Sequence, residues 1–130
     1  MNAEMMKSRT KRFAIDTAKF CECLPSRMSM LAYSKQLIRS SSSVGANYRA
    51  ACRAKSLADF INKLKIVEEE ADESIYFLEL MEQLDSFYAK ELTPLIREGN
   101  ELLSIIVASI NTSKRRNFAG TKIVNLKSKI

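Results

Sequence analysis

Four cations lie on a stretch of chain that holds no acid, and they are the side chains with the clearest chemical character. They are Lys35, Arg39, Arg49 and Arg53. At 3.6 residues per helical turn, all four fall in a stripe about 80° wide, roughly opposite the apolar side of the same segment. No Asp or Glu lies between Arg27 and Lys55. A row of cations repels itself unless anions relieve it, so the stripe predicts a surface that binds phosphate groups.

Serines separate the two pairs of cations in this stripe. Ser40–Ser43 are small, so a nucleic-acid backbone can approach them, and their hydroxyls can donate hydrogen bonds to phosphate oxygens. We predict that further cations join the same nucleic-acid-binding surface: Arg12, Lys19, Lys55 and Lys63. The alternative interpretation is an ordinary solvated face, on which Lys and Arg serve solubility alone.

The residue types and spacings needed for catalysis are missing. The chain has no His, which excludes Ser-His-Asp and Cys-His catalysis and every metal site that uses imidazole. Cys21 and Cys23 have the wrong spacing for a redox or zinc pair, and only Cys52 remains to join them. We interpret Cys21 and Cys52 as small core residues. An odd number of cysteines indicates a reducing compartment, and we expect a cytoplasmic protein.

We also assign no catalytic or metal-binding role to the acidic residues at 68–73. Glu68, Glu69 and Glu70, with Asp72 and Glu73, are spread around a helix, as the acids of a solvated face are. We therefore expect no enzyme activity, no metal and no cofactor.

Charge is segregated along the chain. Residues 1–65 hold 13 Lys or Arg and 4 Asp or Glu, residues 66–113 hold 2 and 11, and residues 114–130 hold 6 and none. The formal net charge is +6. Such segregation predicts separate basic and acidic faces; the first suits nucleic acid, and the second suits basic groups on a neighbouring subunit.

Apolar residues recur at helical spacing in four segments, which must position these side chains. The first helix is expected over residues 8–23 and the second over 30–53, with Pro25 in the break between them. Ser56 is the expected N-cap of a third helix over 57–84. After a connection over 85–93, a fourth helix begins with Pro94 in its first turn.

Long amphipathic helices with short connections predict an all-α fold, an up-down-up-down antiparallel four-helix bundle over residues 1–113. Gly45 lies inside the second helix, where we expect it to allow close helix packing. Residues 114–130 lack a clear amphipathic pattern and are expected to form a flexible basic tail. No apolar run is long enough for a membrane span, and we expect no membrane partner.

The third helix carries apolar residues outside its main stripe. Tyr76, Phe77 and Leu80 lie well away from the apolar side formed by its other residues. A bundle helix needs one buried stripe, so these three predict a contact between subunits. The alternative is that the long helix packs under another part of the same chain.

Two segments of the chain resemble a known family. They are Gln36–Arg49 and the stretch from Ala54 to Leu64, which contains Asp59-Phe60-Ile61. Over residues 9–113 the chain resembles small four-helix-bundle proteins that include those encoded in intervening sequences of bacterial 23S ribosomal RNA genes and the accessory variability determinant of diversity-generating retroelements. Arg39, Asn47 and Phe60 match residues of the family pattern.

The resemblance implies a homopentamer with a positively charged surface, and in the retroelement branch a surface that binds nucleic acid and a reverse transcriptase. Together with the cation stripe, it predicts a non-enzymatic, oligomeric bundle that binds RNA or DNA, with rRNA or a reverse transcriptase among the partners. The competing interpretation is a homo-oligomeric protein-interaction scaffold, in which the basic stripe of one subunit meets the acidic helix of the next.

Overall fold

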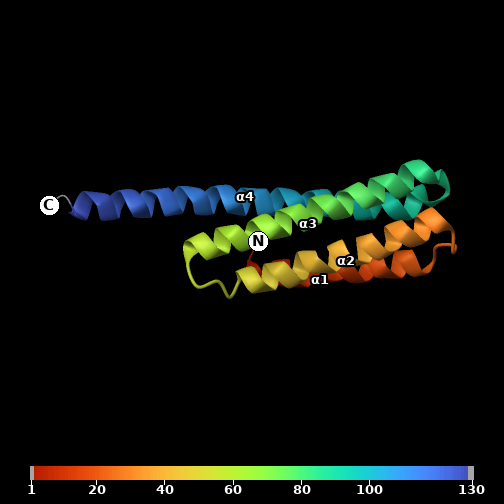
Figure 1. Ribbon diagram of the computed structural model, residues 1–130, viewed down its shortest axis with the longest axis horizontal. Helices are drawn as coiled ribbons and strands as arrows, with labels where there is room; N and C mark the ends of the chain where they lie inside the picture. The colour runs from red at the N-terminus through yellow and green to blue at the C-terminus, as the bar shows by residue number, and fades with distance from the viewer. Residues whose placement is uncertain (1, 129–130) are drawn as a thin grey trace.

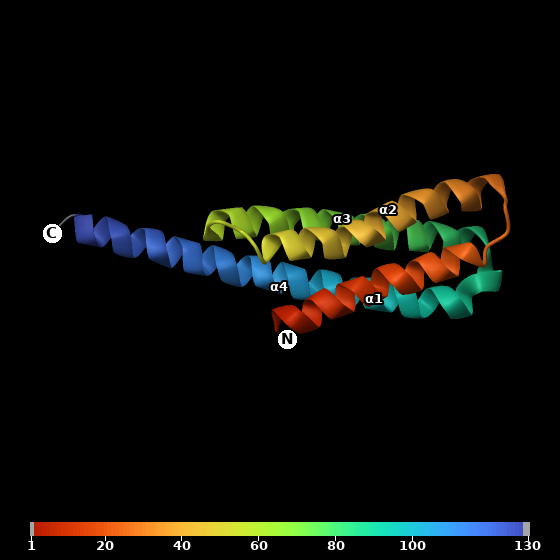
Figure 2. The ribbon, with the colours of Figure 1, turned by 90° about the horizontal axis from the view of Figure 1, so that it is seen from below.

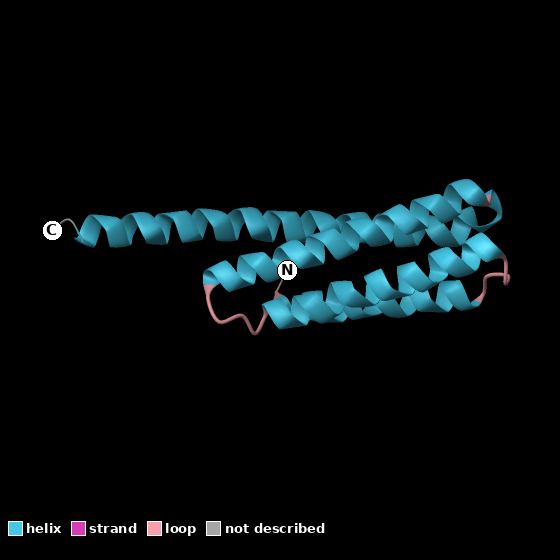
Figure 3. Cartoon of the chain, viewed as in Figure 1, coloured by secondary structure: helices cyan, strands magenta, loops and turns pink. Residues whose placement is uncertain are grey.

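Helices form nearly the whole of the computed structural model, which describes the backbone of residues 2–128 and the side chains of residues 2–119. The elements are α1 (Ala3–Glu22), α2 (Met28–Ala51), α3 (Leu57–Leu84), a short 3-10 helix η1 (Ser86–Tyr88) and α4 (Ala89–Ser128). Short loops join them (Figure 3), and the described residues include no strand. The all-α four-helix prediction is confirmed.

The chain reverses direction at each connection, so α1 and α3 run one way and α2 and α4 the other (Figure 1). Each helix contacts the next one in the chain, and α1 also contacts α4, which closes the four helices into a ring around one core. Viewed from below, α4 lies alongside α1 and then continues past the other three helices (Figure 2).

Side-chain caps fix where the helices begin. Ser56 Oγ accepts the Asp59 backbone N–H at 3.0 Å, so α3 starts and ends at the predicted residues. The predicted start of the first helix at residue 8 is wrong, because Asn2 Oδ1 accepts the Met5 N–H at 2.8 Å and α1 begins at Ala3. The second helix begins at Met28 and ends at Ala51, each two residues before the predicted position.

The start of α4 also differs from the prediction. Asp85 accepts the Phe87 N–H at 3.0 Å and begins η1, which leads directly into α4 at Ala89. Pro94 therefore lies inside the helix, not in its first turn. Leu92 is fully buried, so packing against the core holds this segment helical.

The core contains aliphatic side chains from all four helices, and aromatic residues such as Phe13 and Phe20. Its largest members with almost no exposed surface come from every helix: Phe13 on α1, Leu37 on α2, Leu64 and Leu78 on α3, and Leu102 and Ile106 on α4. Cys21 is buried as predicted, whereas Cys52 is half-buried at the core's edge. Among residues 2–128 the structure has no helix that is long and apolar enough to cross a membrane.

Two glycines set the closest approaches between helices. A Cβ on Gly45 would lie 3.1 Å from Thr10 Oγ1, so the predicted packing role of Gly45 is confirmed at the contact between α2 and α1. A Cβ on Gly99 would lie 2.9 Å from Ile75 Cγ1 and 3.6 Å from Phe13 Cζ, which places α4 tightly against α3 and α1.

Residues 114–128 continue α4 as a helix, where a flexible tail was predicted. No proline follows Pro94, and Lys and Arg are good helix formers, so nothing in the segment stops the helix. Residues 129–130 of the predicted tail lie outside the described residues. The continuation projects beyond the end of the bundle at which the chain begins and α2 meets α3 (Figure 1).

Candidate nucleic-acid interface

The cation stripe of α2 divides between two neighbouring helices. Arg39 turns to α3, where its Nη1 lies 3.2 Å from Glu70 Oε2 and its Nη2 pairs with Glu73. The hydrogen bond to Glu73 raises the pKa of Arg39 above its ordinary value, and Glu70 adds to the shift. The expectation that this stripe finds no acid within its own chain is therefore wrong at Arg39. Glu70 and Glu73 are one turn apart, on the edge of α3 that faces α2.

Two other predicted cations also have partners nearby. Lys63 Nζ lies 2.8 Å from Asp59 Oδ1, and this contact is the main reason that the pKa of Asp59 is lowered. Arg12 Nη1 lies 3.8 Å from Asp16 Oδ1, one turn further along α1. Exposed ion pairs of this kind contribute little to stability, but they reduce the charge that these two cations offer to a ligand.

The remaining five predicted cations form no ion pair with the described carboxylates. They are Lys19, Lys35, Arg49, Arg53 and Lys55. Arg53 Nη1 donates only to the Arg49 carbonyl oxygen, at 3.3 Å. Lys55 lies beside Asp59, which accepts its backbone N–H at 3.1 Å.

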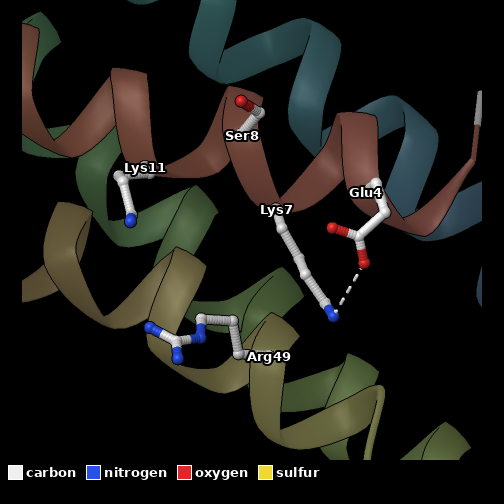
Figure 4. A pocket seen from close by; sticks show the side chains of 5 residues that line it. All are labelled: Glu4, Lys7, Ser8, Lys11 and Arg49. Carbon is white, nitrogen blue, oxygen red and sulfur yellow. Dashed lines mark hydrogen bonds and ion pairs between the residues drawn. The ribbon is translucent and has the colours of Figure 1, made fainter.

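Arg49 shares a surface pocket of about 330 Å³ with residues of α1. The pocket is lined by Glu4, Lys7, Ser8, Lys11 and Arg49. Lys11 and Arg49 extend from two helices toward the same space, and neither has a carboxylate partner among the described residues, whereas Lys7 turns to Glu4 (Figure 4). The Lys7 Nζ to Glu4 Oε1 distance is 3.2 Å. Two unpaired cations that share one concave space give it positive charge, because the one carboxylate in the lining, Glu4, is paired with Lys7.

The close contact at Gly45 brings these cations together. Gly45 lies one turn before Arg49 on α2 and against Thr10 on α1, and Thr10 precedes Lys11. Thr10 is buried, and its hydroxyl donates to the Met6 carbonyl oxygen at 2.8 Å, so it is fixed in place. The absence of a side chain at Gly45 therefore determines the spacing between Lys11 and Arg49.

Arg9 provides a contrast on the other side of α1. Its guanidinium lies 2.7 Å from Glu98 Oε1 and 2.8 Å from Glu101 Oε2, both on α4. The hydrogen bond to Glu98 raises the pKa of Arg9. Arg9, which faces α4, is thus neutralised within the chain, whereas Lys11, beside α2, has no carboxylate partner among the described residues.

Several of the unpaired cations lie at one end of the molecule. The start of α1, the end of α2 and the α2–α3 connection lie at the end from which α4 projects (Figure 1). We define the basic end by the cations of these segments whose side chains have no carboxylate partner among the described residues: Lys11, Arg49, Arg53 and Lys55. Lys35 lies apart from them, about 21 Å from Arg49 at 1.5 Å per helical residue. Lys19 is near the far end of α1.

Sequence reasoning missed Lys7 and Lys11. They are spaced four residues apart, which places them on one face of α1. The spacing is visible in the sequence. The sequence does not indicate, however, that this face of α1 lies next to Arg49 when α1 packs against α2.

The predicted subunit contact on α3 contains residues with different surroundings. Tyr76 is 57% exposed, and Leu80 is half-buried. Phe77 packs within the chain, with its ring centroid 6.1 Å from that of Tyr33 on α2 and 5.7 Å from that of Tyr76. Its position off the main stripe of α3 is explained by this contact with α2. The structure brings Tyr76 and Phe77 together, and a role of these residues between subunits stays a prediction.

Comparison with known proteins identifies the family. The family model described as 23S rRNA-intervening sequence protein matches residues 4–108, which is most of the chain. The chain belongs to this family. A crystal structure of a protein of unknown function from the S23 ribosomal protein family of Bacteroides thetaiotaomicron, at 1.70 Å resolution, is 32% identical in sequence and has a TM-score of 0.77. The match covers 85% of this chain and 99% of that chain. The comparison with curated proteins finds no match.

The part that matches the 23S rRNA-intervening sequence family contains the whole pocket and the ion pairs of Arg39. The family resemblance seen in the sequence is therefore confirmed. The family model ends at residue 108, whereas α4 continues to Ser128.

Proposed function

We propose that this member of the family binds nucleic acid, RNA or DNA, at its basic end and catalyses no reaction. The observation that carries the proposal is the pocket between α1 and α2, in which Lys11 and Arg49 face one space without a carboxylate partner among the described residues. Phosphate is the anion that nucleic acid offers at regular spacing, and Lys and Arg are its usual contacts.

The surroundings of the pocket support a phosphate backbone as the ligand. Ser8 adds a hydroxyl to the pocket, and Arg53 and Lys55 follow Arg49 on the same side of the bundle end. These groups are polar and exposed. We therefore propose binding through phosphates, which reads no sequence and weakens steeply as salt rises.

The test uses the full chain with Lys11→Gln and Arg49→Gln combined. We expect about 50-fold weaker binding to a hairpin RNA near 0.1 M salt, and a slope of log affinity against log salt smaller by about two, since two phosphate contacts are lost. The measurement is fluorescence anisotropy at several salt concentrations. Lys90→Gln with Arg97→Gln is the matched control, because it removes two exposed cations of α4 outside the pocket. Equal loss in both variants would overturn the proposal, as would a wild-type protein that binds no RNA.

A second candidate function is a protein-interaction scaffold. It is favoured by the outer side of α3, where Glu69 and Asp72 are exposed and have no ion-pair partner among the described residues. They lie two turns and one turn before the exposed Tyr76. This face complements the basic end of another copy. If native mass falls as salt is raised and the purified protein binds no RNA, the scaffold accounts for the charge pattern.

A further inference from the structure

The described side chains that follow Ser113 on α4 are outside the core. Ser113 is the last buried residue of α4 among those with described side chains, and residues 114–119 are all exposed. Phe118 is 71% exposed. The helix nevertheless continues to Ser128, about 22 Å beyond Ser113 at 1.5 Å per residue. We call residues 114–128 the basic arm.

The arm has charge of one sign. Residues 114–130 hold six Lys or Arg and no acid, and the last acid of the chain is Glu101. Lys114, Arg115 and Arg116 are consecutive and exposed, and the described contact of Arg115 is with Thr112 Oγ1, at 3.3 Å, in the preceding turn. An exposed helix of this length is marginal in water, and repulsion between its cations weakens it further. A polyanion along the arm would stabilise it.

The position of the arm indicates which polyanion it meets. The arm projects from the same end of the bundle as the start of α1 and the end of α2 (Figures 1 and 2), the segments that carry Lys11 and Arg49. An acidic face of a second copy placed on the arm would leave those bundle cations without a partner. A nucleic acid is long enough to contact both. The family model ends at residue 108, so the arm lies beyond the part of the chain that it matches.

We propose that the basic arm is a second phosphate-binding element, which follows the backbone of a nucleic acid already held at the basic end. This inference rests on the proposed function and adds a dependence on ligand length. The arm spans about 22 Å, which corresponds to about six base pairs of B-form DNA at 3.4 Å each, and to somewhat more in an A-form RNA helix. A short ligand in the pocket does not reach along the arm, whereas a longer one does.

The test compares Lys114→Gln, Arg115→Gln and Arg116→Gln combined, in the full chain, with wild type. The probes are two hairpin RNAs with stems of about 6 and about 20 base pairs. We expect binding of the long hairpin near 0.1 M salt to weaken at least about tenfold, with a smaller salt slope, and binding of the short one to change less than about twofold. Lys65→Gln, Lys90→Gln and Arg97→Gln combined form the control, which lowers the net charge by the same amount.

The outcomes separate this inference from the proposed function. If wild type binds both hairpins and the arm variant binds the long one equally well, the arm proposal is wrong and binding at the basic end stands. Equal weakening by the control variant also overturns the arm proposal, because net charge alone then explains the effect. A fall in native mass of the arm variant with unchanged RNA binding assigns the arm to contact with a second copy instead. A wild type that binds neither hairpin overturns both proposals.

Discussion

Arg39 and Arg49 lie on the same helix and in the same predicted stripe, yet the two sides of α2 give them opposite surroundings. On the α3 side, Arg39 meets Glu70 and Glu73, and the buried Ser40 and Ser74 hydroxyls lie 2.9 Å apart. On the α1 side, Arg49 shares a pocket with Lys7 and Lys11, beside the close contact of Gly45 with Thr10. We call these contact zones the α2–α3 seam and the α1–α2 seam.

The different surroundings of Arg39 and Arg49 show that cations in one stripe of a helix need not belong to one surface of the folded protein. A rotation of some tens of degrees around α2 decides whether a guanidinium faces the acids of α3 or the lysines of α1. One seam uses charge to join helices within the chain, and the other concentrates charge that the fold leaves available.

The largest effect is expected from filling the space at Gly45. Gly45→Leu places a side chain where a Cβ already lies 3.1 Å from the fixed Thr10 hydroxyl, so α1 must move away from α2. We expect a loss of about 3 kcal/mol in the free energy of unfolding, measured by urea titration with circular dichroism. Ala46→Leu, at the exposed neighbouring position, is the control and should change little. A stable Gly45→Leu protein would contradict the assigned role of this contact.

Neutralising Arg39 and Arg49 one at a time tests directly whether the two side chains differ in their contribution to RNA binding. Arg49→Gln should weaken hairpin RNA binding about eightfold near 0.1 M salt, because one unpaired phosphate contact is lost. Arg39→Gln removes the same charge. Because this guanidinium is already paired with Glu70 and Glu73, its loss should weaken hairpin RNA binding less than about twofold. The same anisotropy titration measures both. Equal losses would mean that Arg39 leaves its carboxylates to bind RNA.

The sequence predicted those parts of the fold that depend on local signals. The third helix is correct at both ends, because Ser56 is a strong N-cap and the apolar spacing is regular. The start of α1 was missed because one side chain, Asn2, caps it at the edge of the chain. The helical arm was missed because charged residues without an apolar stripe can be helix or coil.

The candidate site was only partly predictable, for a different reason. Arg49 was found from its charge and the absence of nearby acids in the sequence. Glu70 and Glu73 are 31 and 34 residues away from Arg39, so their pairing depends on which edge of α3 faces α2. The role of Lys11 was missed for the same reason, because its position beside Arg49 depends on which face of α1 packs against α2. Charge pattern within one helix identifies candidates, and the packing between helices selects among them.

A smaller effect should follow from the hydroxyl contact in the α2–α3 seam. Ser74 Oγ lies 2.9 Å from Ser40 Oγ and 2.8 Å from the Glu70 carbonyl oxygen, and both serines are fully buried. Ser74→Ala leaves the Ser40 hydroxyl with one partner fewer, which costs about 1 kcal/mol. Replacing a helical serine by Ala also raises helix propensity, which stabilises the protein. Ser42→Ala, on the exposed side of α2, measures this gain without the loss of a buried hydroxyl contact. The difference between the two variants in urea titration should therefore be about 1 kcal/mol; no difference would mean that the contact adds nothing to this seam.

The smallest effect concerns Tyr48, one position before Arg49 on α2. Burial raises the pKa of Tyr48 from its ordinary value of 10.0 to about 12, with smaller contributions from Cys52 and Glu4. The folded state thus holds the phenolic proton more tightly than the unfolded state does. The resulting stability is fully present below pH 10 and is lost as pH rises from 10 toward 12. Arg39 keeps its charge over this range because its carboxylate partners raise its pKa above the ordinary value, so the guanidinium of the α2–α3 seam does not titrate with Tyr48.

Unfolding measured at several values between pH 9 and 11.5 should show a modest decline that Tyr48→Phe removes, since this variant has no phenol to ionise. Tyr76→Phe, which removes an exposed hydroxyl, is the matched control and should leave that decline in place. If Tyr48→Phe declines with pH as steeply as wild type, the loss of stability arises elsewhere and the assignment to Tyr48 is wrong. If the decline disappears only in Tyr48→Phe, the proton on this one core hydroxyl accounts for the alkaline loss of stability, independently of nucleic-acid binding.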